Sequence, residues 1–151
     1  MKTSVIALGA AALALMFSTG NAAAQAAAAP DTTIVIRSEG SNLEFNPSEI
    51  AVKAGTRVRI RYINNGTFPH NIVIVKKDAD IDVIGLAAFQ AGSTGYIPEK
   101  EKPRMVAHST LAEPGKTVEF TFVAPPAGEY PFVCVYPGHY NMMLGMFKSL
   151  R

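Results

Sequence analysis

The segment from Cys134 to Met143 contains three types of side chain that bind soft metal ions. Cys134 can supply a thiolate, His139 an imidazole nitrogen and Met143 a thioether. The pair Pro137-Gly138 stands between the cysteine and the histidine, and it is typical of a tight turn that brings the imidazole back toward the sulfur. A thiolate, an imidazole and a thioether on one loop favour copper over hard cations. The sequence therefore predicts a copper site in this loop.

A copper site of this kind needs a second imidazole, and His70 is the best candidate. It stands where a turn at 64–69 enters an apolar stretch at 71–75. In a β-sandwich, a strand that begins there can lie beside the strand that ends at Cys134. Two histidines and one cysteine form a trigonal plane to which a methionine adds a long, weak axial bond, the arrangement of blue copper sites. The cysteine binds as a thiolate, so a metal would also occupy the one thiol of the chain.

Both segments resemble those of a known family, the cupredoxins, which are type 1 (blue) copper proteins. The stretch 128–140, which contains the cysteine and the Pro-Gly-His turn, is similar to the ligand loop of azurins and auracyanins. The stretch 64–71 is similar to the segment around the first histidine of plastocyanins, and 106–109 resembles a stretch of azurin that holds no ligand. The resemblance implies one copper ion bound by His70, Cys134, His139 and Met143.

The axial ligand is a choice among methionines at 142, 143 and 146, and methionine is also a common filler of cores. Met143 matches the azurin spacing and precedes Leu144-Gly145, so it is the preferred ligand. The resemblance also implies that Asn71 hydrogen-bonds the backbone near the cysteine, whereas His108 has no soft neighbour and is expected to be no ligand. The chain departs from azurins because one cysteine cannot form their disulfide. It also has Pro69, as in plastocyanins, where azurins have glycine, so we expect four ligands rather than five.

The elements that must position these ligands are short strands separated by turns. Residues 57–63 alternate most clearly, with apolar side chains at 58, 60 and 62 and arginines between them. Residues 80–90 are predicted to form a short helix, a flap whose apolar side includes Ile84, Leu86 and Phe89. Seven or eight strands predict an all-β fold, an antiparallel Greek-key β-sandwich in one domain over 30–151. The predicted strands are 32–37, 49–52, 57–63, 71–75, 105–111, 116–123, 128–135 and 144–150.

The N-terminus is predicted to be a signal peptide over 1–24, with cleavage within 22–29. Lys2 provides a positive charge, residues 5–17 form an uncharged apolar run, and small residues follow it. The run is shorter than the about 20 apolar residues that a membrane-spanning helix needs. No cysteine lies near the cleavage region to carry a lipid. We therefore expect export to the periplasm and no stable insertion in a membrane.

A closed set of four ligands leaves no position for a substrate, so the predicted function is one-electron transfer and not catalysis. A redox partner, such as a cytochrome, a reductase or an oxidase, is expected to dock on an apolar surface near His139 that includes Phe68, Pro137, Tyr140 and Met142. The alternative is a copper storage or delivery module with an exchangeable metal. The 14 basic and 12 acidic residues form no long basic run, so nucleic acid is not an expected partner.

Overall fold

Eight strands follow one another in the computed structural model, which describes residues 29–151. All eight predicted strands are present, although β4 begins two residues later than predicted and β5 and β7 end earlier. The predicted signal peptide over 1–24 lies outside the described residues. Within 29–151, no helix combines the length and the apolar character needed to cross a membrane. The strands are β1 (Thr32–Gly40), β2 (Glu49–Lys53), β3 (Arg57–Gly66), β4 (Val73–Val75), β5 (Met105–His108), β6 (Thr117–Val123), β7 (Gly128–Val133) and β8 (Leu144–Leu150).

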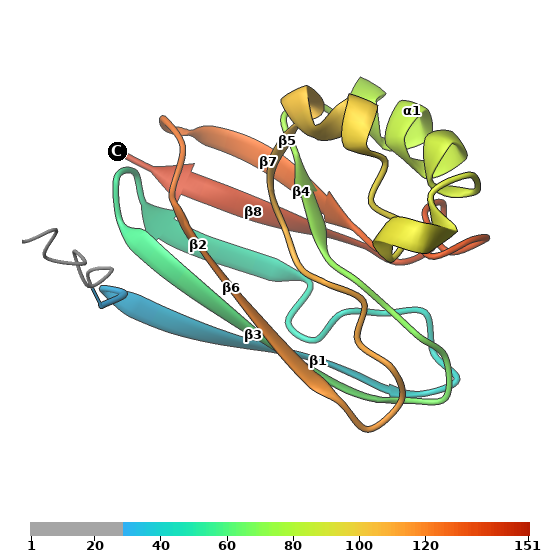
Figure 1. The fold of residues 1–151 in the computed structure, drawn as a ribbon. Coiled ribbons are helices and arrows are strands. Elements are labelled where there is room, and N and C mark those ends of the chain that lie inside the picture. Colours follow the sequence, from blue (N-terminus) through green and yellow to red (C-terminus); the bar gives the residue numbers. More distant parts are fainter. Residues whose placement is uncertain (1–28) are drawn as a thin grey trace, which may run out of the picture.

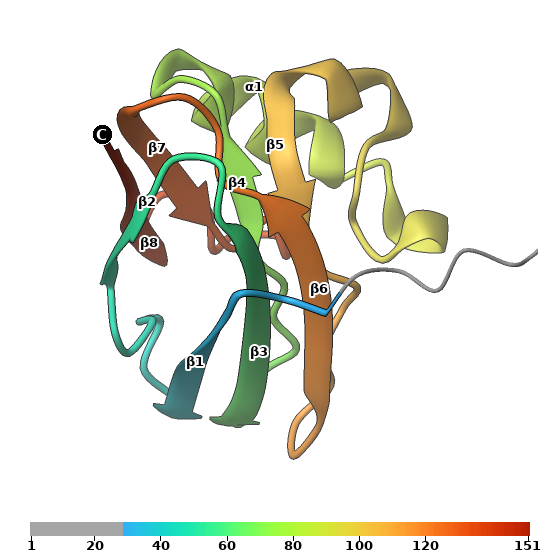
Figure 2. The same ribbon diagram turned by 90° about the vertical axis from the view of Figure 1, so that its left-hand side faces the viewer.

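The strands form two sheets, one in the order β1-β3-β6 and the other in the order β2-β8-β7-β4-β5 (Figures 1 and 2). This confirms the predicted eight-stranded β-sandwich, but the expectation of purely antiparallel sheets is wrong. The strand β1 pairs with β3 in parallel, and β2 pairs with β8 in parallel. Because β1 and β2 belong to different sheets, the chain crosses the sandwich before it reaches β3, and such a crossover permits parallel pairing.

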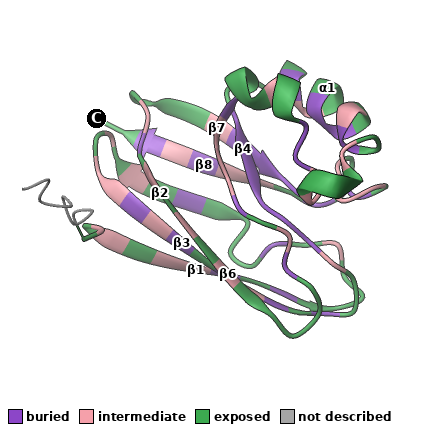
Figure 3. Cartoon of the chain, viewed as in Figure 1, coloured by how far each residue is buried: buried purple, intermediate pink, exposed green. Residues whose placement is uncertain are grey.

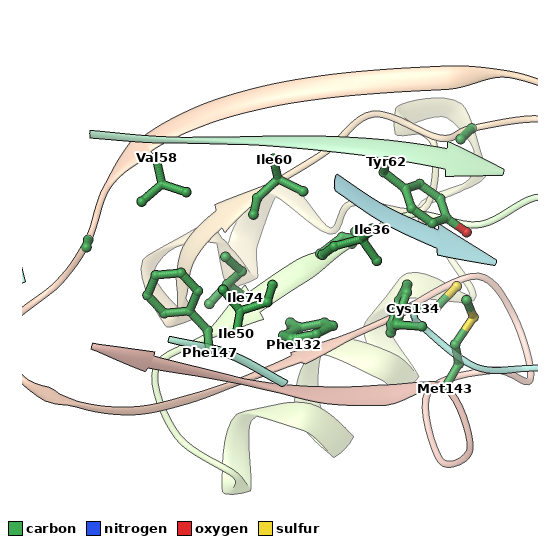
Figure 4. Close-up of a cluster of buried hydrophobic side chains, with 14 residues drawn as sticks. Ile36, Ile50, Val58, Ile60, Tyr62, Ile74, Phe132, Cys134, Met143 and Phe147 are labelled. Atoms are coloured by element: carbon green, nitrogen blue, oxygen red, sulfur yellow. The ribbon is translucent and has the colours of Figure 1, made fainter. Parts of the chain in front are cut away.

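The core lies between the two sheets and follows from the alternation of side chains along each strand (Figures 3 and 4). On β3, Val58, Ile60 and Tyr62 are fully buried, as their period-2 spacing predicts. They face Phe132 on β7 and Phe147 on β8, which are buried as well. Burial of these side chains is the main favourable contribution to the stability of the sandwich.

The flap, which we define as residues 79–104, covers the outer face of the five-stranded sheet. It contains the helix α1 (Ala79–Ala88) and the 3₁₀ turns η1 (Gly92–Thr94) and η2 (Glu99–Arg104). The helix packs with Ile84 and Ala88 on Val73 and Val133, which point away from the sandwich core. The predicted helix is confirmed, and so are Ile81 and Ile84 of its predicted apolar side, whereas Leu86 and Phe89 are exposed. Leu86 is 61% exposed, because residues two apart lie about 200° apart around a helix and Ile84 faces the sheet.

Gly145 on β8 permits the closest packing at the centre of the core, and we expect its replacement by alanine to be costly. A Cβ atom at this position would lie 2.1 Å from Cζ of Phe132, a buried ring that cannot move without disturbing the core. Overpacking of this kind typically costs about 1–3 kcal/mol, and we expect the upper part of that range for Gly145→Ala. Urea unfolding of the metal-free protein measures this loss in the free energy of unfolding. Gly92→Ala is the control, since its nearest contact would be an ordinary 3.8 Å; equal unfolding midpoints for both variants would contradict the prediction.

Candidate metal centre

Cys134 follows directly after β7, and it is fully buried in the core of the sandwich. The chain then turns at Pro137-Gly138, where Gly138 has a φ of +85°, a left-handed conformation that glycine adopts readily. The backbone N–H of His139 donates to the carbonyl of Tyr136 over 3.0 Å and closes the turn. The turn brings the imidazole of His139 back beside the cysteine sulfur, as the sequence predicts.

His70 comes from a distant part of the chain, between β3 and β4, and its backbone is held from both sides. Its N–H donates to the carbonyl of Ala112 over 3.0 Å, and its carbonyl accepts from the N–H of Ala112 over 2.8 Å. The ring is fully buried. Its Nε2 atom is buried without a hydrogen-bond partner, so Nδ1 is the nitrogen through which this ring meets other polar atoms.

The three predicted ligand atoms converge on one buried point. The Sγ atom of Cys134 lies 3.6 Å from Nδ1 of His70 and 3.6 Å from Nδ1 of His139. The two Nδ1 atoms lie 3.2 Å apart, so the three atoms form a nearly equilateral triangle. A sulfur and two imidazole nitrogens that face one another in this way match the trigonal donor set of a soft metal ion. The residues present therefore fit copper.

The electrostatics of the triangle agree with a metal site. Burial, followed by the neighbouring His139, lowers the pKa of His70 to about 4, and burial lowers the pKa of His139 as well. Both rings are therefore neutral near pH 7 and offer lone pairs. Burial raises the pKa of the Cys134 thiol to about 11, although backbone N–H groups of Asn71 and Tyr136 donate to the sulfur and oppose this shift. A thiolate in this core needs a bound cation to balance its charge.

The two candidate methionines of the loop lie in opposite environments. Met143 is fully buried in the same core cluster as Cys134, and Figure 4 shows the two sulfur atoms close together. The carbonyl of Met143 also accepts the backbone N–H of Cys134 over 3.1 Å, which joins the two ends of the loop. Met142 is 61% exposed and points away from the core. The structure thus brings Met143, and not Met142, to the triangle.

Asn71 connects three segments around the site. Its Oδ1 accepts the N–H of Val135 over 2.9 Å, which confirms the link to the backbone near the cysteine that the resemblance implies. Its Nδ2 donates to the carbonyl of Gly95 in the flap over 3.1 Å. Since Asn71 follows His70 directly, one buried side chain ties the first histidine to the cysteine strand and to the flap.

Asn64 is a structural residue of the site that the sequence interpretation missed. Its side chain donates to the carbonyls of Phe68 and Ala112, each over 2.8 Å, and accepts from the N–H of Gly66 over 2.9 Å. These bonds hold the turn that leads to His70. A signal was present: position 64 continues the inward alternation of 58, 60 and 62, so a buried polar side chain with a structural role could have been predicted there.

His108 does not join the cluster. It lies on β5 opposite Val73, and its Nδ1 is 3.1 Å from the carbonyl of Ser109. Within residues 29–151, the group of histidine, cysteine and carboxylate side chains that could hold a metal consists of His70, Cys134 and His139. His108 is therefore outside the site, as predicted.

Comparison with known proteins agrees with this geometry. The family model of copper binding proteins, plastocyanin/azurin family, matches residues 32–148. Auracyanin-A of Chloroflexus aurantiacus is 42% identical over 116 residues, which are 75% of this chain and 71% of that protein. Auracyanin-B of the same organism is 27% identical over 80% of this chain, and the match spans 52% of its length. The solved structure of auracyanin A, described as a "blue" copper protein, superposes with a TM-score of 0.75 at 40% identity and covers 78% of this chain and 98% of that one.

The match extends from β1 to β8 and so includes both segments that supply the triangle. A likeness of this length and identity reaches well beyond a shared fold. The chain therefore belongs to the plastocyanin/azurin family of copper binding proteins, the cupredoxins, whose members are blue copper proteins known as electron carriers.

Proposed function

We propose that the protein binds one copper ion through the cysteine and two histidines of the buried triangle, with Met143 as axial ligand, and carries single electrons between redox proteins. The observation that carries the proposal is the triangle itself, with sides of 3.2 to 3.6 Å. When bound, copper supplies the one-electron change between Cu(I) and Cu(II). The chain holds the donor atoms in a close-packed core, which limits their rearrangement between the two oxidation states.

His139 is the ligand through which electrons would enter and leave. It is 7% exposed, whereas Cys134, His70 and Met143 are fully buried. The ring of Phe68 packs edge-on against the ring of His139, with 6.0 Å between the ring centroids. Phe68 is 44% exposed, and Met142, three residues after His139, is exposed as well. An apolar surface of this kind suits the small, transient contacts of redox partners.

Tyr140, which was also expected on this docking surface, is half-buried. Its ring lies on Gly85 of α1, where a Cβ atom would come within 2.3 Å of it. Pro137 is half-buried as well, so Phe68 and Met142 are the most exposed of the four apolar side chains expected there. The chain would meet its partner in the periplasm, after removal of the predicted signal peptide over 1–24.

Spectra of the copper-loaded protein without its signal peptide test the proposal. We expect an intense visible absorption, a narrow copper hyperfine splitting in the EPR spectrum and a reversible one-electron midpoint. A copper competition assay in both oxidation states separates a carrier, which holds the metal tightly, from a delivery module, which exchanges it. A colourless protein, or an EPR spectrum of ordinary square-planar copper, would contradict the proposal.

Met143→Leu tests the axial assignment. The variant should still bind copper, because the three ligands of the triangle remain, but the loss of the thioether should weaken Cu(II) binding more than Cu(I) binding. For a one-electron couple, the midpoint potential rises by about 60 mV for each factor of ten by which the loss of Cu(II) affinity exceeds the loss of Cu(I) affinity. Protein-film voltammetry and EPR measure the change. The exposed Met142→Leu serves as the control, and the assignment fails if both variants keep the original spectrum and midpoint.

A further inference from the structure

Two tyrosines of the ligand loop, residues 134–143, reach out to the flap. Tyr140, next to His139, lies on the backbone of α1 at Gly85, where a Cβ atom would be 2.3 Å from Cγ of the ring and 2.5 Å from Cδ2. No other residue at 85 would leave this space. Glycine is among the least favourable residues in a helix interior. Its presence at position 85 is explained by the ring of Tyr140, which occupies the space that a side chain would need.

A second contact runs from His139 through two aromatic rings to the middle of the flap, between η1 and η2. The centroid of the Tyr136 ring lies 5.0 Å from the centroid of the His139 ring and 5.0 Å from that of the Tyr96 ring. Tyr96 adopts a φ of +65°, a left-handed conformation that is unusual for an aromatic residue. Its neighbour Gly95 accepts a hydrogen bond from Asn71 over 3.1 Å. The flap thus meets the ligand loop on both sides of His139, and it is also bound to the segment of His70.

We propose that the flap fixes the orientation of His139, so that Gly85, Tyr96 and Tyr140 are positioning residues for electron transfer. The inference rests on the proposed role of His139 as a copper ligand. Backbone hydrogen bonds within the loop hold its turn, and the rings of His70 and Phe68 also lie against the ring of His139. The flap adds the contact of Tyr136 with Tyr96 and that of Tyr140 with Gly85. A loop that the flap contacts at Tyr136 and at Tyr140, before and after His139 in the sequence, would keep this histidine in place when the oxidation state changes, which lowers the rearrangement that accompanies each transfer.

Hydrogen exchange in the metal-free protein tests the inference without copper. The N–H groups of His139, Met142 and Met143 bond to carbonyls within the loop over 2.9 to 3.0 Å, so their exchange rates report its opening. We expect Tyr140→Ala to speed this exchange about tenfold, as the loss of one aromatic packing contact implies. Tyr140→Phe keeps the ring and should exchange like the original protein.

Three further variants sharpen the test. Gly85→Ala should force the ring of Tyr140 away and speed exchange to a similar extent, yet add little in the Tyr140→Ala background, because the ring is then absent. Leu86→Ala, on the exposed side of the same helix, should change nothing. Tyr96→Ala probes the second contact independently and should also speed exchange, which keeps the inference testable if Tyr140→Ala does not fold.

In the copper-loaded state, Tyr140→Ala and Gly85→Ala should alter the EPR hyperfine splitting and slow electron self-exchange about tenfold, whereas Leu86→Ala should not. The inference is overturned if the original protein is blue but the variants show the same rates of amide hydrogen exchange and of electron self-exchange as the original protein. In that case the flap does not position His139. An additive effect of Gly85→Ala and Tyr140→Ala would overturn it as well. If the original protein shows no blue copper spectrum, it is the proposed function that fails.

Discussion

Replacing Cys134 with serine is expected to abolish the intense visible absorption of the copper-loaded protein. The absorption of blue copper sites arises from charge transfer between the thiolate and Cu(II), and a serine hydroxyl stays protonated and gives no such transition. Copper affinity should fall by at least about 100-fold, since even residues that only support a ligand cost 10–100-fold when they are replaced. Titration with copper under visible and EPR detection measures both effects.

The fold should survive this replacement. Serine has nearly the shape of cysteine, and its oxygen can accept the backbone N–H groups of Asn71 and Tyr136 that now donate to the sulfur. We expect the free energy of unfolding of the metal-free protein to fall by about 1–2 kcal/mol at most, because a buried hydroxyl is tolerated where it is hydrogen-bonded. Met142→Ser is the control, as an exposed change in the same loop that should keep the colour. A Cys134→Ser protein that stays blue would disprove the proposed site.

Asn71→Ala is expected to cause the largest loss of stability among the changes near the site. Asn71 is fully buried, and its removal leaves the N–H of Val135 and the carbonyl of Gly95 without partners. A buried unpaired group costs about 1–3 kcal/mol, so we expect a decrease of about 2–4 kcal/mol in the free energy of unfolding. Urea unfolding of the metal-free protein measures this decrease.

The same replacement on the surface provides the control. Asn65 is exposed on β3, and Asn65→Ala should change the unfolding free energy by no more than about 0.5 kcal/mol. The Asn71→Ala variant should also show an altered EPR spectrum once loaded with copper, because the link between the cysteine strand and the segment of His70 is lost. Equal stability of the two variants would mean that the Asn71 hydrogen bonds contribute little.

The sequence by itself determined the features that depend on neighbouring residues. Alternation at 58, 60 and 62 predicted β3 and its buried side, because successive side chains of a strand point to opposite faces. The loop from Cys134 to His139 was predicted because its Pro-Gly turn is a local feature, and the structure has that turn with Gly138 in the left-handed conformation. The apolar side of α1 was predicted correctly at Ile84 but wrongly at Leu86 and Phe89, since the sequence of the helix does not say which of its apolar residues meet the sheet.

Only the tertiary structure decided which distant segments meet. His70 and Cys134 are 64 positions apart, and their atoms come within 3.6 Å because β4 and β7 pair in one sheet. The parallel pairing of β1 with β3, and the separation of a buried Met143 from an exposed Met142, also follow from packing across the sandwich. Strand pairing and burial depend on contacts between residues far apart in the chain, so spacing along the sequence identifies the ligand types, and the packed core determines which of them converge.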